Sequence, residues 1–140
     1  MNQEFRLSVP GRYENLALIG EFVAVAARRA HLDDKAVFDA QLAVDEACTN
    51  VIVHAYGGEG LGDISLEVQV SEGEIQVRLR DRGEAFDPRT VPPPNLTCKL
   101  SERKNGGLGL HFMRNLMNNV HFETDEELGN CLKMTKRQEP

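Results

Sequence analysis

Hydrophobic and polar residues alternate in five stretches of the chain, and alternation over a few residues is typical of strands with one buried face. These stretches are residues 4–9, 64–70, 75–79, about 120–125 and about 130–136. The first is predicted to be a short edge strand that ends at Pro10-Gly11, since these residues break regular structure. The second and third are separated by Ser71-Glu72-Gly73, which predicts a β-hairpin.

Apolar residues recur with the spacing of an α-helix in three other stretches. The first covers residues 13–30 and the third about 108–118. The second begins at Asp33-Asp34, which suit a helix N-terminus, and runs to about residue 56, where Gly57-Gly58 end it. The order is strand, two helices, hairpin, long loop, helix and two strands. It predicts an α+β fold, a two-layer sandwich with the helices on one face of a mixed, mostly antiparallel sheet.

The composition is that of an ordinary soluble globular protein, with 41% hydrophobic and 27% charged residues among 140. This length suits a single domain over residues 1–140. No apolar run approaches the roughly 20 residues of a membrane-spanning helix, and the N-terminus does not resemble a secretion signal, so we expect no membrane association. Cys48, Cys98 and Cys131 are far apart and odd in number. A cytoplasmic location without disulfides or a zinc site is therefore expected.

The net charge of −6 argues against direct binding of nucleic acid, because affinity for a phosphate backbone requires clustered Lys and Arg. Basic residues gather only at Lys99, Arg103 and Lys104. On charge alone a solvated loop is the favoured interpretation, and contact with one nucleotide is the alternative. These residues lie in the long loop, about 88–107, which contains four prolines and no apolar period. Such a loop is rare in a compact domain unless it is a lid or is disordered.

A polar stripe follows the second predicted helix, where Glu46, Asn50 and His54 are spaced four residues apart beside an apolar stripe. An Asn carbonyl can be the single protein ligand to Mg²⁺, with phosphate oxygens and waters completing the octahedron. A carboxylate one turn earlier can accept a proton from a nucleophile that attacks a γ-phosphate. Taken alone, the stripe is more simply interpreted as a solvated helix face, and His54 as a hydrogen-bonded packing residue.

A second cluster begins at Asp81, which continues the alternation of the strand before it and is therefore predicted to point into the core layer. A buried carboxylate needs a donor, and the exocyclic amino group of adenine is one, whereas guanine would present a carbonyl. Gly83 would let the backbone approach a flat base closely. The alternative is a strand-end aspartate that caps a turn.

A third cluster is the segment NGGLGL, residues 105–110, directly before the last predicted helix. Glycines that lead into a helix N-terminus leave backbone N–H groups free to hold phosphate oxygens. The segment is not a Rossmann motif, because Phe112 stands at the third glycine position and a loop precedes it. A Walker A loop is also excluded, since no G-K-[ST] is present. The alternative is a flexible linker that starts a helix.

The order and separation of the three clusters resemble those of the GHKL superfamily of gyrase, Hsp90, histidine kinases and MutL. DEACTNVIVHAY resembles its N box, DRGEAFDP its G1 box and GGLGL its G2 box, and the loop about 88–107 lies where its ATP lid belongs. The resemblance spans essentially the whole chain. The motif E-A-C-T-N-x-x-x-H-A-Y most resembles that of the anti-sigma-factor serine kinases of the SpoIIAB and RsbW kind. It implies the Bergerat ATP-binding fold with ATP and Mg²⁺ as cofactors.

The resemblance also implies roles for individual residues. Glu46 would activate the substrate serine, Asn50 would bind Mg²⁺, and Asp81 would pair with adenine. The residues implied at the nucleotide are Asn50, Asp81, Gly83, Ala85, Lys104, Gly107, Leu108, Gly109 and Leu110. Two positions depart from the family pattern: Ala85 replaces a glycine, and Asn130 stands where a threonine often supports the adenine.

The function that we expect is transfer of the ATP γ-phosphate to a serine of a small antagonist protein, which in the family is a STAS-domain partner. The alternative from another class is an ATP-dependent binding switch that sequesters a sigma factor or another regulator without catalysis. A structural module with an empty pocket would require all three clusters to be accidental. The length leaves no room for the dimerisation domain of a sensor kinase or the transducer domain of gyrase or MutL. The resemblance suggests a homodimer.

Overall fold

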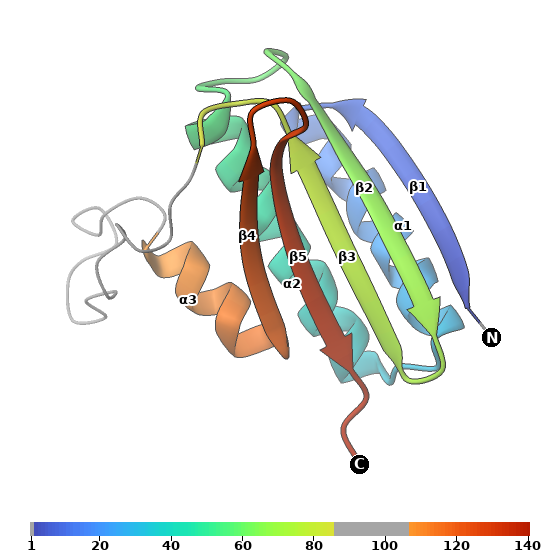
Figure 1. The fold of residues 1–140 in the computed structure, drawn as a ribbon. Helices are drawn as coiled ribbons and strands as arrows, with labels where there is room; N and C mark the ends of the chain where they lie inside the picture. Colours follow the sequence, from blue (N-terminus) through green and yellow to red (C-terminus); the bar gives the residue numbers. More distant parts are fainter. Residues whose placement is uncertain (1, 86–106) are drawn as a thin grey trace.

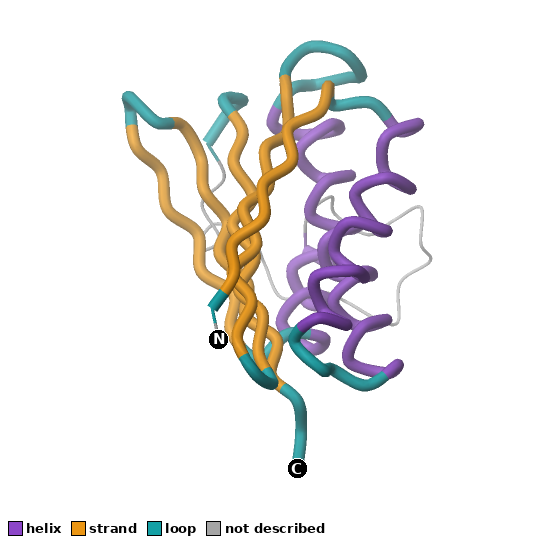
Figure 2. Tube along the Cα trace, turned by 90° about the vertical axis from the view of Figure 1, so that its right-hand side faces the viewer, coloured by secondary structure: helices purple, strands orange, loops and turns teal. Residues whose placement is uncertain are grey.

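A computed structural model of the chain describes residues 2–85 and 107–140. A five-stranded sheet forms one layer and the helices form the other, all on one face of the sheet (Figures 1 and 2). The elements are β1 (Gln3–Pro10), a 3₁₀ turn (Tyr13–Asn15), α1 (Leu16–Arg29), α2 (Asp34–Asn50), a π-helical turn (Val51–Ala55), β2 (Asp63–Ser71), β3 (Glu74–Asp81), α3 (Gly107–Leu116), β4 (Asn119–Asp125) and β5 (Gly129–Arg137). The predicted α+β sandwich is therefore confirmed.

The strand order is β1-β2-β3-β5-β4, and every pairing among the described strands is antiparallel. The sequence predicted a mixed, mostly antiparallel sheet, and the described strands form a purely antiparallel one. β5, the last strand, lies between β3 and β4, and β1 is an edge strand as predicted. The β3–β5 register places Asp81 opposite Asn130, although these residues are far apart in the sequence.

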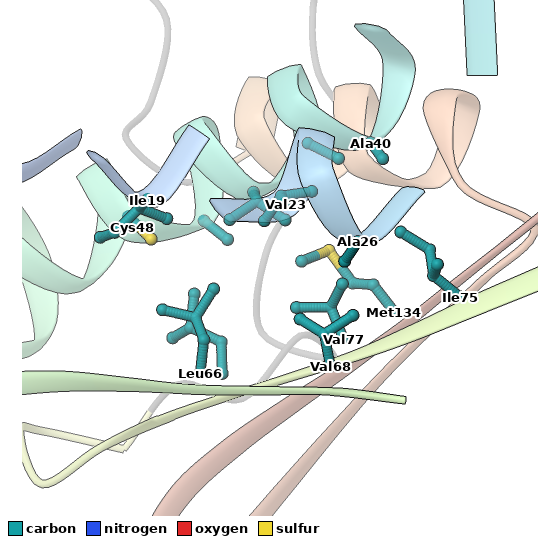
Figure 3. Close-up of a cluster of buried hydrophobic side chains, with 14 of the residues drawn as sticks. Ile19, Val23, Ala26, Ala40, Cys48, Leu66, Val68, Ile75, Val77 and Met134 are labelled. Atoms are coloured by element: carbon teal, nitrogen blue, oxygen red, sulfur yellow. The ribbon is translucent and has the colours of Figure 1, made fainter. Parts of the chain in front are cut away.

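The core lies between the two layers and is built from the buried faces of the strands and helices (Figure 3). Val68, Val77 and Met134 project from β2, β3 and β5 and are completely buried. Small residues on the helices, such as Ala40 of α2, let α1 and α2 pack closely above them. Tight packing of this kind makes each buried methylene contribute about 0.8 kcal/mol to stability. The core therefore fixes the helices on the sheet.

The second helix begins as predicted but ends differently. The side chain of Asp33 caps α2 by accepting a hydrogen bond from the Ala36 N–H (2.9 Å). The prediction of one regular helix to about residue 56 is wrong in its last part, because the α-helix stops at Asn50 and a π turn follows. Gly57 then takes a positive φ of 80°, which ends the segment. Single π turns are frequent at functional sites.

A buried ion pair ties β5 to the helix layer. Lys136, which is 7% exposed, donates hydrogen bonds to Asp39 Oδ2 of α2 (3.1 Å) and to the Leu116 carbonyl at the end of α3 (2.6 Å). Burial by itself would raise the pKa of Asp39, but hydrogen bonds from Lys35 and Lys136 outweigh it and hold that pKa below its ordinary value. One lysine thus joins three elements.

No helix in the described ranges, 2–85 and 107–140, is long and apolar enough to cross a membrane.

Candidate nucleotide site

The end of β3 meets the end of the π turn, and backbone contacts hold the two together. Glu84 N–H donates to the Ala55 carbonyl (2.8 Å), and a Cβ at Gly83 would overlap that same carbonyl group. The Tyr56 hydroxyl accepts from the Arg82 N–H (3.0 Å) and donates to the Asp63 carbonyl (2.6 Å). Gly83 is therefore required here for close backbone approach, which the sequence attributed to a nucleotide base.

Asp81 is buried at the end of β3, with 7% of its surface exposed, as the alternation predicts. Its Oδ1 accepts hydrogen bonds from the Gly83 N–H (2.9 Å) and from Asn130 Nδ2 (2.8 Å). Both of these donors bond to Oδ1, and no residue of the ranges 2–85 and 107–140 donates a hydrogen bond to the second carboxylate oxygen, Oδ2. The turn-capping alternative is thus realised, because Asp81 closes the turn to Gly83 with one oxygen.

Asn130 of β5 stands where the family often has a threonine that supports the adenine, and in the structure it bonds to Asp81 itself. Its Nδ2 also approaches the Gly83 carbonyl (3.1 Å) and the Glu84 carbonyl (3.2 Å), and its Oδ1 accepts from Thr124 Oγ1 (3.3 Å). The side chain therefore joins Asp81 to the loop that follows it. Only its place opposite Asp81 in the sheet register could have revealed this role, and that pairing is not readable from the local pattern.

Glu46 and Asn50 lie one turn apart on α2, and both are half-buried. Burial raises the pKa of Glu46, the neighbouring Asp45 raises it further, and His54 opposes the shift. A carboxylate with a raised pKa holds a proton more readily and is a stronger base than an exposed glutamate. The two side chains thus offer a base and a neutral oxygen ligand one helical turn apart.

His54 is exposed, so the expectation of a packing residue is wrong. The reason is the π turn, which contains His54 and has more residues per turn than an α-helix. The regular helical spacing from Glu46 and Asn50 is therefore interrupted, although His54 still lies close enough to Glu46 to lower its pKa.

The glycine cluster lies at the start of α3, where Gly107, Leu108 and Gly109 occupy the first helical turn. Leu110 is buried at 5% exposure, and α3 packs beside α2 (Figure 1). Ala85 is exposed at the end of the described loop. Of the predicted lid, residues 88–106, including Lys99, Arg103 and Lys104, lie outside the described residues.

An open recess of about 450 Å³ lies elsewhere, beside the β2–β3 hairpin, where Gln3, Gln69 and Glu74 line it. Because Glu74 begins β3 and Asp81 ends it, the recess lies at the far end of the strand from Asp81. Within the described part of the chain, no three His, Cys, Asp or Glu side chains gather as a metal site. A magnesium ion held by one Asn and phosphate oxygens needs no such cluster.

Comparison with known proteins places this geometry in a family. The family model described as "Histidine kinase-like ATPase domain" matches residues 9–136. A serine-protein kinase RsbW of Listeria innocua is 33% identical over 140 residues, covering 97% of this chain and 88% of that protein. A serine-protein kinase RsbW of Bacillus thuringiensis is 29% identical over 138 residues, covering 96% and 84%.

A solved structure shows the same fold. The RsbU and RsbW domains of a Mycobacterium tuberculosis protein match with a TM-score of 0.67 at 14% identity, over 96% of this chain and 32% of that one. This chain thus spans about a third of that longer protein. The chain belongs to the family of histidine kinase-like ATPase domains, the GHKL superfamily, and within it to the group of RsbW-type anti-sigma-factor kinases.

Proposed function

We propose that this protein is an ATP-dependent serine kinase of the anti-sigma-factor type that phosphorylates a small, STAS-like antagonist protein. The observation that carries the proposal is the pairing of Glu46, whose pKa burial raises, with Asn50 one turn later on α2. The π turn that follows this helix is joined at its end to the loop after Asp81 by the hydrogen bond from Glu84 to Ala55. The base, the metal ligand and the adenine partner therefore belong to one connected unit.

Adenine would bind at Asp81. Because Gly83 and Asn130 already donate to Oδ1, the other oxygen would accept a hydrogen bond from the adenine amino group. Guanine presents a carbonyl at that position, and two acceptors facing each other repel. The backbone at Gly83 and Ala85 would lie along the base.

The triphosphate would lie between α2 and the start of α3. Backbone N–H groups of Gly107, Leu108, Gly109 and Leu110 open α3, and a helix N-terminus favours anions. Lys104 of the lid would add a positive charge. The amide oxygen of Asn50 suits Mg²⁺, a hard cation that prefers oxygen ligands and would neutralise phosphate charge there.

Glu46 would act as the general base. Its carboxylate would accept the proton of the substrate serine as the serine oxygen forms a bond to the γ-phosphorus. The bond between that phosphorus and the β–γ bridging oxygen breaks, and ADP leaves with the electron pair. The products are a phosphoserine protein and ADP.

The partners follow from the same proposal. The relatives are named serine-protein kinases, so a protein serine is the proposed acceptor. Sequestration of a sigma factor and assembly as a homodimer are further parts of the proposal that rest on the family resemblance alone.

The test is phosphoryl transfer from Mg-[γ-³²P]ATP to candidate antagonist proteins encoded in neighbouring genes. Glu46→Gln keeps the shape of the side chain and removes the base, so transfer should fall by about 10²-fold or more while ATP still binds. Asn50→Ala removes the metal ligand, so binding of Mg-ATP should weaken too. Asp34→Asn, at an exposed carboxylate at the other end of the same helix, is the matched control and should transfer at the parent rate.

Two results would change the assignment. Transfer by Glu46→Gln at the parent rate would show that another group is the base. Tight binding of Mg-ATP without phosphorylation of any antagonist would favour the non-catalytic switch, in which both substitutions act only through nucleotide affinity.

A further inference from the structure

Tyr56, the residue after the π turn, is bonded to three separate parts of the chain. Its N–H donates to the Val51 carbonyl (2.9 Å) and closes the turn. Its hydroxyl donates to the Asp63 carbonyl at the start of β2 (2.6 Å) and accepts from the Arg82 N–H just after β3 (3.0 Å). A Cβ at Gly62 would overlap the ring, so this glycine makes room for it. The place of the hydroxyl is therefore fixed by backbone and ring together.

The π turn sets the direction in which Tyr56 points. A π-helix has about one more residue per turn than an α-helix, which rotates the residues that follow by about 100° around the helix axis. The end of β3 and the start of β2 lie at the same end of the molecule as this turn (Figure 1). With this direction, one hydroxyl group reaches both strands.

The hydroxyl of Tyr56 holds the peptide group that follows Asp81. The Arg82 N–H belongs to this peptide group and donates to the hydroxyl. The carbonyl of the same group, that of Asp81, lies so close to Gly129 of β5 that a Cβ there would overlap it. The peptide group is thus held at its N–H and confined at its carbonyl. Because this group is part of the backbone of Asp81, holding it also fixes the direction of the carboxylate.

The rest of the loop after Asp81 is held in a similar way. The next two N–H groups, those of Gly83 and Glu84, donate to Asp81 Oδ1 (2.9 Å) and to the Ala55 carbonyl (2.8 Å). Ala55 and Tyr56 are consecutive, so two of the three acceptors in this loop come from the end of the π turn. The helix layer therefore fixes the loop that begins at the proposed adenine partner.

We propose that Tyr56 is a positioning residue for adenine recognition, whose hydroxyl holds the peptide after Asp81 so that Oδ2 of Asp81 meets the amino group of adenine. This inference rests on the function proposed above. A recognition group that is fixed before the ligand arrives loses less conformational entropy on binding, which strengthens binding. Burial raises the pKa of Tyr56, so the hydroxyl keeps the proton that it donates to Asp63.

The experiment removes this hydroxyl and measures nucleotide affinity. Tyr56→Phe keeps the ring that packs at Gly62, so the fold should survive. Calorimetric titration with Mg-ATP, at a temperature where both proteins are folded, should show a loss of about five- to tenfold in affinity. The KM for ATP should rise by the same factor while kcat at saturating ATP is retained, because Glu46 and Asn50 are unchanged.

A double-mutant cycle separates positioning of Asp81 from a general loosening of the fold. Asp81→Asn and Tyr56→Phe act on the same contact with adenine, so their effects should not add. Asp81→Asn should therefore cost about threefold less affinity, or less still, in the Tyr56→Phe background than in the parent. Asn50→Ala, at the proposed metal ligand, should cost the same factor in both backgrounds.

Tyr13→Phe is the matched control, since it makes the same chemical change at the other tyrosine of the chain. Tyr13 is 47% exposed, and its hydroxyl has no hydrogen bond to any residue of the ranges 2–85 and 107–140. Its ATP affinity should stay within about twofold of the parent value.

The possible failures are distinguishable. If the parent binds Mg-ATP and Tyr56→Phe binds it equally well, the inference is wrong and the proposed function stands. A lower Tm with unchanged affinity would show that Tyr56 is merely structural. An equal cost of Asp81→Asn in both backgrounds would show that Tyr56 does not act through Asp81. A parent protein that binds no Mg-ATP would overturn both the inference and the proposed function.

Discussion

Replacement of Asp81 by asparagine tests the nucleotide site most directly. Asp81 accepts two hydrogen bonds at Oδ1, from Gly83 (2.9 Å) and Asn130 (2.8 Å), and an asparagine carbonyl can accept both. The fold should therefore survive, but an NH₂ group would replace Oδ2, the oxygen that we propose accepts from adenine. A donor would then oppose the amino group of adenine.

The size of the effect follows from that lost bond. A hydrogen bond to a charged group is worth about 1.5–3 kcal/mol, which corresponds to a loss of roughly ten- to a hundredfold in ATP affinity. Calorimetric titration of both proteins with Mg-ATP measures the difference, and thermal unfolding checks that the fold is intact. The parent should also bind GTP much more weakly than ATP. Glu84→Gln, at an exposed carboxylate in the same loop, should bind ATP as the parent does.

Asn130 provides a second arm of this test. Asn130→Ala removes the donor shared by Asp81 and the carbonyls of Gly83 and Glu84, so ATP affinity should fall by about tenfold. Asn130→Thr, which restores one donor, should recover part of the loss. Unchanged ATP affinity in Asp81→Asn would remove Asp81 from the site and refute the reasoning, whatever the Asn130 variants show.

Three further predictions concern the helices that carry the site. Lys136→Met should lower the free energy of unfolding by about 1.5–3 kcal/mol in denaturant titrations, because Asp39 keeps its hydrogen bond from Lys35, and adding Asp39→Leu should recover part of this loss. Gly83→Ala should lower the free energy of unfolding by about 1–3 kcal/mol, because the new Cβ would overlap the backbone of Ala55. The control Gly20→Ala should not lower it in this way, because a Cβ there makes only ordinary contacts. Because its pKa is raised, Glu46 loses its proton at a higher pH than an ordinary glutamate does. The rate of phosphoryl transfer should therefore rise with pH above the usual glutamate range, and Glu46→Gln should abolish this dependence.

Each prediction has a result that contradicts it. A single Lys136→Met variant as stable as the parent would show that the ion pair contributes nothing net. Equal stability of Gly83→Ala and Gly20→Ala would mean that the loop moves away from the helix without loss. A pH–rate profile unchanged by Glu46→Gln would assign the titration to another group.

The sequence by itself determined the elements and the direction of individual side chains. Alternation in β3 put Asp81 on the same face as Ile75, Val77 and Leu79, and the structure has it there. The acidic pair at residues 33–34 marked the start of α2, because a cap and the first turn are local features. The spacing of the three clusters was also sufficient to indicate the family, which the comparisons confirm.

The tertiary structure decided which elements meet. Because β5 lies between β3 and β4, Asn130 contacts Asp81, which is 49 residues away in the sequence. The asparagine that departs from the family pattern at position 130 therefore bonds directly to Asp81. A π turn interrupts the regular helix before His54, and like-charged Arg78 and Lys133 lie opposite each other in the sheet register. Periodicity records only which face of an element is buried, because that depends on neighbours within a few residues. Strand partners and register depend on packing of the whole core, so no local pattern contains them.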